Sequence, residues 1–199
     1  MNIANSLEFK RKIVHILIGI MAILLIVYEV IGSLIIFIIL IAGIFFSFLS
    51  LRFRLPVLSF FLDNFERKEE KGKLPGRAII FAIVGSLLAL QLFERNIALA
   101  SIVILIFADP ISHLVGKNLG KTKSFLDKRK NIEGHIVGAI VSSLFAMFFV
   151  HPVLAIAGSL TAMFFESVII EIQKIELDDN LVIPLAAGTA MFLIVSYII

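Results

Sequence analysis

The stretch 97–116, IALASIVILIFADPISHLVG, decides the fold, because it is long enough to cross a bilayer and holds a single charged residue, Asp109. A helix of about 20 mostly apolar residues spans the hydrocarbon core. The candidate spans are continuously apolar instead of alternating, which favours helices over barrel strands. The sequence therefore predicts an all-α fold, a polytopic membrane helix bundle of about seven transmembrane helices. The other candidate spans are 12–29, 31–51, 76–93, 134–150, 152–172 and 181–199.

The composition supports this prediction. Of the 199 residues, 60% are hydrophobic and 17% are charged, whereas a soluble domain is about half apolar and a quarter charged. Ordinary soluble proteins and disordered chains are therefore excluded. The length allows one integral membrane domain over residues 1–199. The absence of cysteine excludes disulfides, thiol nucleophiles and cysteine-ligated metals.

The positive charges predict the orientation of the chain in the bilayer. Of the 18 Lys and Arg residues, all but Arg95 lie in, or at the edges of, four segments on one side of the predicted spans. The positive-inside rule places these segments and the N-terminus in the cytoplasm and the C-terminus outside. The net charge of +3 therefore indicates membrane topology and not nucleic-acid binding. The predicted cytoplasmic segments are about 1–11, 52–75, 117–133 and 172–180.

Polar side chains gather on the cytoplasmic side, and the outer half of the spans is nearly all apolar. A receptor for outside ligands, a channel or a transporter would need polar residues there. The pattern favours an enzyme that meets a water-soluble substrate from the cytoplasm and a lipid from within the bilayer. The stretch 52–72 mixes apolar and charged residues, and it is compatible with an amphipathic surface helix or a solvated connector.

Two carboxylates fall inside predicted spans. Asp109 lies about eight residues from the cytoplasmic end of its span, roughly 12 Å deep at 1.5 Å per residue. Pro110 predicts a kink, and His113 shares a helix face with Asp109. Glu166 lies about a turn and a half inside the sixth span. Such charges cost several kcal/mol unless they are paired or bound to a cation, and they usually mark function. The structural alternative is an Asp109–His113 or carboxylate–lysine pair that only locks helices together.

Near the start of the first span, Arg11, Lys12 and His15 form a small polar group. Arg11 and His15 are four residues apart and share a helix face. They are compatible with anchoring at the lipid interface by snorkelling. They are equally compatible with the cytoplasmic mouth of a site.

The region between the fourth and fifth spans carries glycines at helical spacing and a dense run of cations. The glycines permit close helix packing, and a helix start at Gly134 also suits phosphate. A nearby carboxylate suits Mg²⁺, so the region predicts a nucleoside triphosphate site with magnesium, although no Walker motif occurs. The alternative explanation for the cations is that they set the orientation of the chain in the membrane and contact anionic lipid. The residues are Gly116, Lys117, Gly120, Lys121, Lys123, Lys128, Arg129, Lys130, Gly134 and Gly138.

An acidic cluster, Asp178-Asp179-Asn180, precedes the seventh span. One such residue suffices as a helix N-cap, and three exceed that need. If the bundle brings the cluster close to Asp109 and Glu166, these residues form a carboxylate shell for one or two metal ions.

These motifs together resemble a family of polytopic membrane enzymes that contains dolichol kinase, phytol kinase and CTP-dependent diacylglycerol kinase. The resemblance runs along most of the chain, and it rests on three motifs in the same order and topological places. The motifs are Glu8-x-x-Arg11-Lys12-x-x-His15; Asp109 with Gly116 and Gly120, followed by Lys130-x-x-Glu133-Gly134-x-x-x-Gly138; and Glu166 with Asp178-Asp179-Asn180-Leu181-x-Ile183-Pro184.

The chain departs from the family pattern at two positions. Asn131 stands where the family usually has Ser or Thr, and His113 stands where it usually has a small residue. CDP-diacylglycerol synthases share a similar Lys-x-x-Glu-Gly region. Their C-terminal signature differs from the Asp-Asp-Asn of this chain, which favours the kinase over the cytidylyltransferase.

The resemblance implies transfer of the γ-phosphoryl group of CTP to a membrane lipid alcohol with Mg²⁺. It implies metal ligands among Asp109, Glu166, Asp178, Asp179 and Asn180, and a general base at Asp109 or His113. Glu133 would orient a lysine or bind ribose or metal, and His15 would meet phosphate or the lipid hydroxyl. A polyprenol, dolichol or diradylglycerol fits as the lipid, and the oligomeric state stays open. The implied nucleotide contacts are Arg11, Lys12, Gly116, Lys117, Gly120, Lys121, Lys123, Lys130, Asn131 and Gly134.

Overall fold

The structure is a computed structural model that describes residues 3–54, 56, 59, 74–124, 126–168, 171–172 and 175–197. Most of the stretch 52–72, for which the sequence allows an amphipathic surface helix, lies outside the described residues. The same is true of Lys174 in the last predicted cytoplasmic segment.

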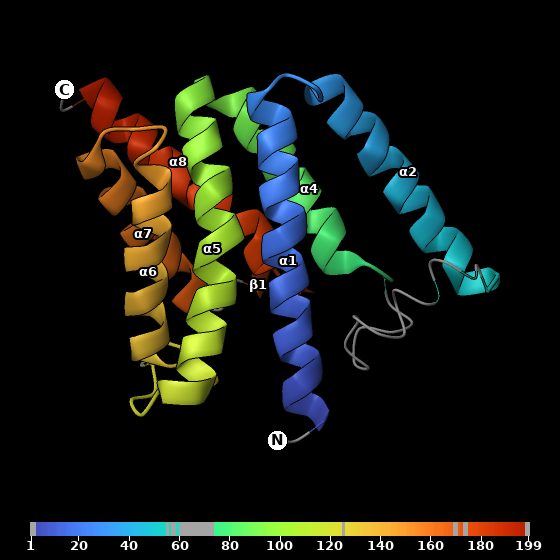
Figure 1. Cartoon of the computed structure of the whole chain (residues 1–199), viewed down its shortest axis with the longest axis horizontal. Helices are drawn as coiled ribbons and strands as arrows, with labels where there is room; N and C mark the ends of the chain where they lie inside the picture. The colour runs from blue at the N-terminus through green and yellow to red at the C-terminus, as the bar shows by residue number, and fades with distance from the viewer. Residues whose placement is uncertain are drawn as a thin grey trace.

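The described residues form an all-helical fold with one minimal hairpin (Figure 1). The hairpin is antiparallel and consists of β1 (Glu171–Ile172) and β2 (Ile175–Glu176). Each predicted span corresponds to one helix, which confirms the all-α class. The helices are α1 (Ile3–Val27), α2 (Ser33–Arg52), α4 (Arg77–Leu92), α5 (Arg95–Leu119), α6 (Ile132–Ala146), α7 (Pro152–Ser167) and α8 (Asp179–Tyr197).

Three of these helices, α2, α5 and α8, are long and apolar enough to cross a membrane, as expected for a membrane protein. Helices α4, α6 and α7 are apolar but have only 15 or 16 residues, shorter than the spans predicted for them. The reason is that an apolar run continues where the helix does not. Residues 147–150 form a turn after α6, and the hairpin follows soon after α7.

Helix α5 is the centre of the bundle (Figure 1). It packs against α1, α4, α6, α7 and α8, and its apolar residues are buried along most of its length. Two apolar clusters fill the space around it. One joins α5 to α6, α7 and α8, and the other joins α5 to α1, α2 and α4. Helix α2 packs mainly on α4 and leans away from the bundle, so most of its apolar side chains stay exposed.

The two ends of the bundle differ in charge. The N-terminal end of the chain and the α5–α6 loop lie at one end, and the C-terminus lies at the other (Figure 1). Arg95, the cation predicted for the opposite side, pairs with Glu29 at 2.7 Å and donates to the carbonyls of Ile26 and Val27. It thereby satisfies carbonyl groups at the C-terminal end of α1, as a cation at a helix C-terminus does.

Glycines allow α5 and α6 to pack with their backbones in contact. A Cβ added at Gly134 would overlap the Ser112 carbonyl oxygen, and one at Gly138 would lie 3.0 Å from the Ala108 carbonyl oxygen. Small residues at helix contacts are the usual means of close approach in membranes. The role in helix packing that the sequence predicts for this glycine pair is confirmed.

We expect Gly134→Ala to lower the free energy of unfolding by about 1–3 kcal/mol, the usual cost of forcing extra volume into a tight contact. Gly43→Ala is the matched control, because the space beside Gly43 on α2 is open within 4 Å. That change should be neutral or stabilise the helix by up to about 1 kcal/mol. Circular-dichroism melting of both variants in detergent measures the difference, and equal melting temperatures would contradict the prediction.

Candidate functional site

A cavity of about 830 Å³ opens at the end of the bundle that carries the α5–α6 loop. Its lining comes from α1, α4, α5, the α5–α6 loop, α6, α7 and the segment that starts α8. Among the described residues, the polar and charged ones that line it are Arg11, Lys12, Arg77, Asp109, Ser112, His113, Lys117, Lys123, Asp127, Arg129, Lys130, Asn131, His135, Glu166, Asp178, Asp179 and Asn180.

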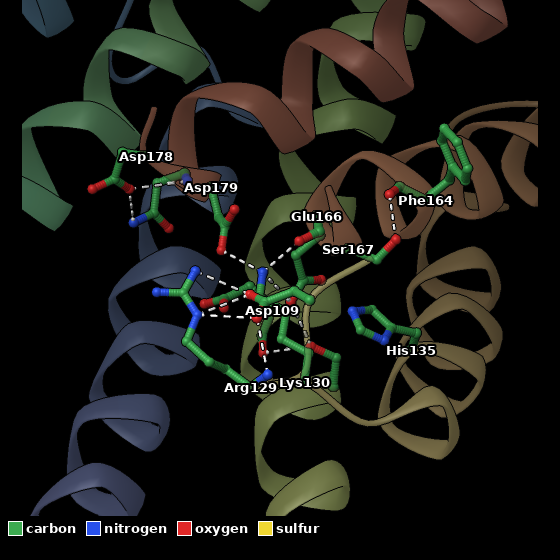
Figure 2. A network of polar contacts seen from close by, with 12 residues as sticks. Asp109, Arg129, Lys130, His135, Phe164, Glu166, Ser167, Asp178 and Asp179 are labelled. Carbon is green, nitrogen blue, oxygen red and sulfur yellow. Dashed lines mark hydrogen bonds and ion pairs between the residues drawn. The ribbon is translucent and has the colours of Figure 1, made fainter. Parts of the chain in front are cut away.

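Three carboxylates from three helices meet in this cavity. Asp109 comes from α5, Glu166 from the last turn of α7, and Asp179 from the first turn of α8. Each offers an oxygen atom, and these atoms all lie within 4.8 Å of one another. We call these residues the acidic triad. The β1–β2 hairpin reverses the chain between α7 and α8, and this reversal places Asp179 beside Glu166 (Figure 2).

The structure changes the predicted positions of the triad along the helices. Glu166 lies in the last turn of α7, which ends at Ser167, and not a turn and a half inside a longer helix. Asp179, which was predicted to precede the seventh span, lies in the first turn of α8. Helix α5 continues through Pro110 to Leu119, so Asp109 lies deeper from the helix end than the predicted span implied.

Two lysines contact the acidic triad from elements that carry none of its members. Lys12 Nζ on α1 donates to Asp109 Oδ2 at 2.7 Å. Lys130 Nζ from the α5–α6 loop donates to Asp179 Oδ2 at 2.8 Å and lies 3.7 Å from Glu166 Oε1 (Figure 2). Burial acts to lower the pKa of Lys130, but the charges of Glu166 and Asp179 outweigh it and the pKa is raised. The Lys130 ammonium group therefore stays charged.

Pairing with lysine was the structural alternative for these carboxylates, and it accounts for them only in part. Three carboxyl groups face two ammonium groups, so the carboxyl groups outnumber their lysine partners by one. Glu166 is only 4% exposed, and its Oε1 accepts a 2.9 Å hydrogen bond from Ser112 Oγ. Its buried Oε2 has no hydrogen-bond partner among the described residues. A buried polar oxygen without a partner is costly, and carboxylate oxygens in such a position suit a divalent cation such as Mg²⁺.

Asp178 and Asn180 form a separate group beside the triad. Asp178 pairs with Arg77 Nε at 3.3 Å, and it accepts hydrogen bonds from the backbone N–H and the Nδ2 of Asn180. Arg77 also lies over the ring of Phe81, 5.4 Å from its centroid. The structure therefore places Asp178 with a cation from α4, and it places Asp179 with the other two carboxylates.

The α5–α6 loop is held by its own hydrogen bonds, and these direct Lys130 inward. Ser124 N donates to the Lys130 carbonyl, and Lys130 N donates to the Asp127 carbonyl. The side chain of Asp127 is buried and accepts bonds from the backbone N–H and the Nε of Arg129. Burial alone would raise the pKa of Asp127, but the bonds from Arg129 outweigh it and the pKa is lowered.

The other residues predicted for the site in and beside the α5–α6 loop differ in whether they line the cavity. Lys117, Lys123 and Arg129 are exposed and line the cavity; we call them the mouth cations. The Lys121 side chain is exposed and does not belong to the lining. Glu133 Oε1 accepts the backbone N–H groups of Lys121 and Thr122, so Glu133 closes the loop.

Asn131, which departs from the family pattern, has a structural contact. Its Nδ2 donates to the Gly116 carbonyl at 2.6 Å, which ties the start of α6 to the last turns of α5. A Cβ at Gly120 would meet Asn131 Cβ at 2.6 Å, so Gly120 leaves room for this contact. Gly134 packs on Ser112 and is not among the residues that line the cavity.

The residues predicted for the site on and beside α1 also differ in whether they line the cavity. Arg11 lines the cavity and pairs with Glu8 at 3.2 Å. His113 Nε2 lies 3.3 Å from Glu8 Oε1, so Glu8 is an ion-pair partner of His113. His15 bonds to the backbone at Leu105 and lies within electrostatic range of Asp109, but it does not belong to the lining.

Four lining residues were missed by the sequence interpretation: Arg77, Ser112, Asp127 and His135. A signal existed for Ser112, which follows Asp109 by three residues and so shares its helix face. His135 follows Asn131 by four residues, and its Nδ1 lies 3.0 Å from the Asn131 carbonyl oxygen. Arg77 and Asp127 gave no such signal, because their neighbours in the cavity come from distant parts of the chain.

Comparison of the chain with protein-family models, with curated proteins and with solved structures gives no match.

We expect Asp127→Asn to loosen the α5–α6 loop, because the amide loses the charge that holds Arg129. Trypsin should then cleave after Lys128 or Arg129 faster than in the wild type at neutral pH. Leu126→Ala is the matched control, since Leu126 is the neighbouring residue and its side chain is 52% exposed. Equal cleavage rates for the two variants would contradict the role of Asp127.

The same contact predicts the pH dependence of the wild-type loop. Because the pKa of Asp127 is lowered by folding, its stabilisation is complete above the ordinary value near 3.9. It is lost as the pH falls through the lowered pKa. Hydrogen exchange of residues 126–131, corrected for the intrinsic pH dependence, should show protection that declines only below about pH 4.

Proposed function

We propose that this chain is a multi-pass membrane enzyme that uses Mg²⁺ and transfers the γ-phosphoryl group of CTP to the hydroxyl of a membrane lipid alcohol. The observation that carries the proposal is the acidic triad, in which Glu166 is buried and the two aspartates are half-buried, beside the mouth cations in one cavity. The resemblance of the sequence motifs to the CTP-dependent lipid kinases supplies the nucleotide and the class of lipid.

The distribution of charge in the cavity supports a metal–triphosphate ligand. The mouth cations, Lys117, Lys123 and Arg129, are complementary to phosphate oxygens, and the triad is complementary to a divalent cation. Magnesium in proteins is usually held by one or two carboxylates together with substrate phosphates. Phosphoryl transfer needs mainly positioning and charge neutralisation, and both are available from groups in this cavity.

The donor set fits magnesium. Asp109, Glu166 and Asp179 would hold the ion, and Glu166 Oε2 is the buried oxygen that has no other partner in the described chain. Bound there, magnesium would neutralise the charge that builds up on the phosphate oxygens during transfer. Ser112 orients Glu166 by its hydrogen bond to Oε1.

The remaining roles belong to side chains of the chain itself. The mouth cations bind the triphosphate, and Arg11 and His113 lie at the cavity beside α1, where a lipid hydroxyl would arrive. In the transfer, the bond from the γ-phosphorus to the bridging oxygen breaks and CDP leaves. The alcohol oxygen bonds to that phosphorus, and its proton passes to a base. Asp109 and His113 remain the two candidates for the base.

The arrangement of the bundle supports an active site that faces the cytoplasm. The cavity lies at the end of the bundle that contains the α5–α6 loop, where the positive-inside rule places the cytoplasm. The rest of the described bundle is filled by two apolar clusters around α5. A transporter would need a polar path through that region, so this filling favours an enzyme. The lipid chain can reach the cavity from the bilayer between helices.

Assays with labelled CTP test the reaction. We expect label from the γ-phosphate, and none from the α-phosphate, to appear in the lipid when the purified protein is given Mg²⁺ and a panel of polyprenols and diradylglycerols. Transfer of the α-label to a lipid phosphate would instead indicate a cytidylyltransferase. No transfer of either label to any lipid of the panel would argue against both reactions.

Substitutions in the acidic triad test the site. Asp109→Asn and Asp179→Asn should each lower kcat more than about 100-fold, because a metal ligand worth several kcal/mol in the transition state is lost. Glu94→Gln is the matched control, since Glu94 is an exposed carboxylate at the opposite end of the bundle. Circular dichroism checks that the variants are folded, and near-normal activity in both triad variants would remove the metal proposal.

A further inference from the structure

Lys12 and Lys130 occupy the carboxylate oxygens that a divalent cation would need. Lys12 Nζ is bound to Asp109 Oδ2, and Lys130 Nζ is bound to Asp179 Oδ2 and close to Glu166 Oε1. Each member of the acidic triad is therefore in contact with an ammonium group. Ammonium groups and a divalent cation at the same oxygens repel one another, and this repulsion is strong in a partly buried site.

Both lysines come from elements outside the three helices that carry the triad. Lys12 is on α1, which packs along α5, and Lys130 is on a loop that forms its own internal hydrogen bonds. Both side chains belong to the lining of the cavity, together with the mouth cations. A lysine side chain has a flexible four-carbon stem, so each ammonium group can reach either the triad or a phosphate in the cavity.

We propose that Lys12 and Lys130 are positioning residues that occupy the cation site while no metal is bound and move to the triphosphate when a divalent cation takes the carboxylates. This inference rests on the proposed function, and it concerns the order in which the site is filled. In the resting protein the ammonium groups pair with the carboxylates of the triad. In the loaded protein they add two positive charges beside the phosphates.

A permanent structural role explains part of the contacts, because Lys130 Nζ also donates to the Glu166 backbone carbonyl, but it does not explain all of them. Ion pairs that only join helices would be expected to give every carboxylate oxygen a hydrogen-bond partner. Glu166 Oε2 has no partner among the described residues. The triad also has one more carboxyl group than the two lysines can pair. A divalent cation would supply the partner that Glu166 Oε2 lacks in the described chain.

The test measures the affinity for Mn²⁺ in nanodiscs by electron paramagnetic resonance, without CTP and without lipid alcohol. Lys12→Met and Lys130→Met should each bind Mn²⁺ about 5- to 150-fold more tightly than the wild type, the usual range of coupling between ligands. Lys10→Met and Lys128→Met are the matched controls, because these lysines are exposed on the same helix and the same loop. Their Mn²⁺ affinity should be unchanged.

The second readout is the KM for CTP. The same two variants should show a KM for CTP raised by about tenfold or more, a loss of about 1.4 kcal/mol of binding, while the controls do not. Tighter Mn²⁺ binding together with weaker CTP binding is the expected result. Unchanged or weaker Mn²⁺ binding, or an unchanged KM, would overturn the inference, since a purely structural role predicts no such opposite effects.

Hydrogen exchange of the wild-type protein decides the matter if the variants do not fold. Mg²⁺ alone should raise amide exchange in residues 126–132, because Lys130 leaves the triad. Mg²⁺ with a non-hydrolysable CTP analogue should lower it again. No rise with Mg²⁺ alone would overturn the inference. The Mn²⁺ and Mg²⁺ measurements need no reaction, so a failure of this inference can be told apart from a failure of the γ-label assay.

Discussion

The contact between Lys130 and the acidic triad ties together parts of the chain that are far apart in the sequence. Lys130 extends from the α5–α6 loop to Glu166 on α7 and Asp179 on α8, and Asp109 completes the group from α5. Removing one partner of a buried ion pair is strongly destabilising, because the other charge stays behind in a region of low polarity. In the protein without a bound metal, this contact therefore holds the loop, the end of α7 and the start of α8 together around the cavity.

Close packing of α5 on α6 makes this contact possible. Gly134 brings the two backbones together, and Asn131 fastens the start of α6 to the Gly116 carbonyl. The loop between the helices then closes over a short distance, and Asp127 holds its tip through Arg129. Lys130 is left pointing inward and the mouth cations outward. The basic residues of this region thus have two roles. The role of each follows from how far its side chain is buried, and not from whether it is Lys or Arg.

The hydropathy of the sequence was sufficient to predict the all-α class, since a continuous apolar run in a bilayer must satisfy its own backbone and is therefore helical. It was not sufficient to predict where the helices end. Residues 168–170 continue the apolar run of α7, yet α7 ends at Ser167 and a hairpin follows. Hydropathy depends on side chains, whereas a helix end also depends on backbone hydrogen bonds and on the direction that the next helix must take.

For the site, the sequence by itself determined which residues are too costly to bury without a reason: Asp109 and Glu166 within apolar runs, and the acidic cluster before the last helix. Only the tertiary structure decided how they are grouped. It separated Asp179, which joins the triad, from Asp178, which pairs with Arg77. The physical reason is that the cost of burying a charge depends on the residue type and on the apolar sequence around it. The partner that offsets this cost comes from another helix, and its identity depends on how the helices pack.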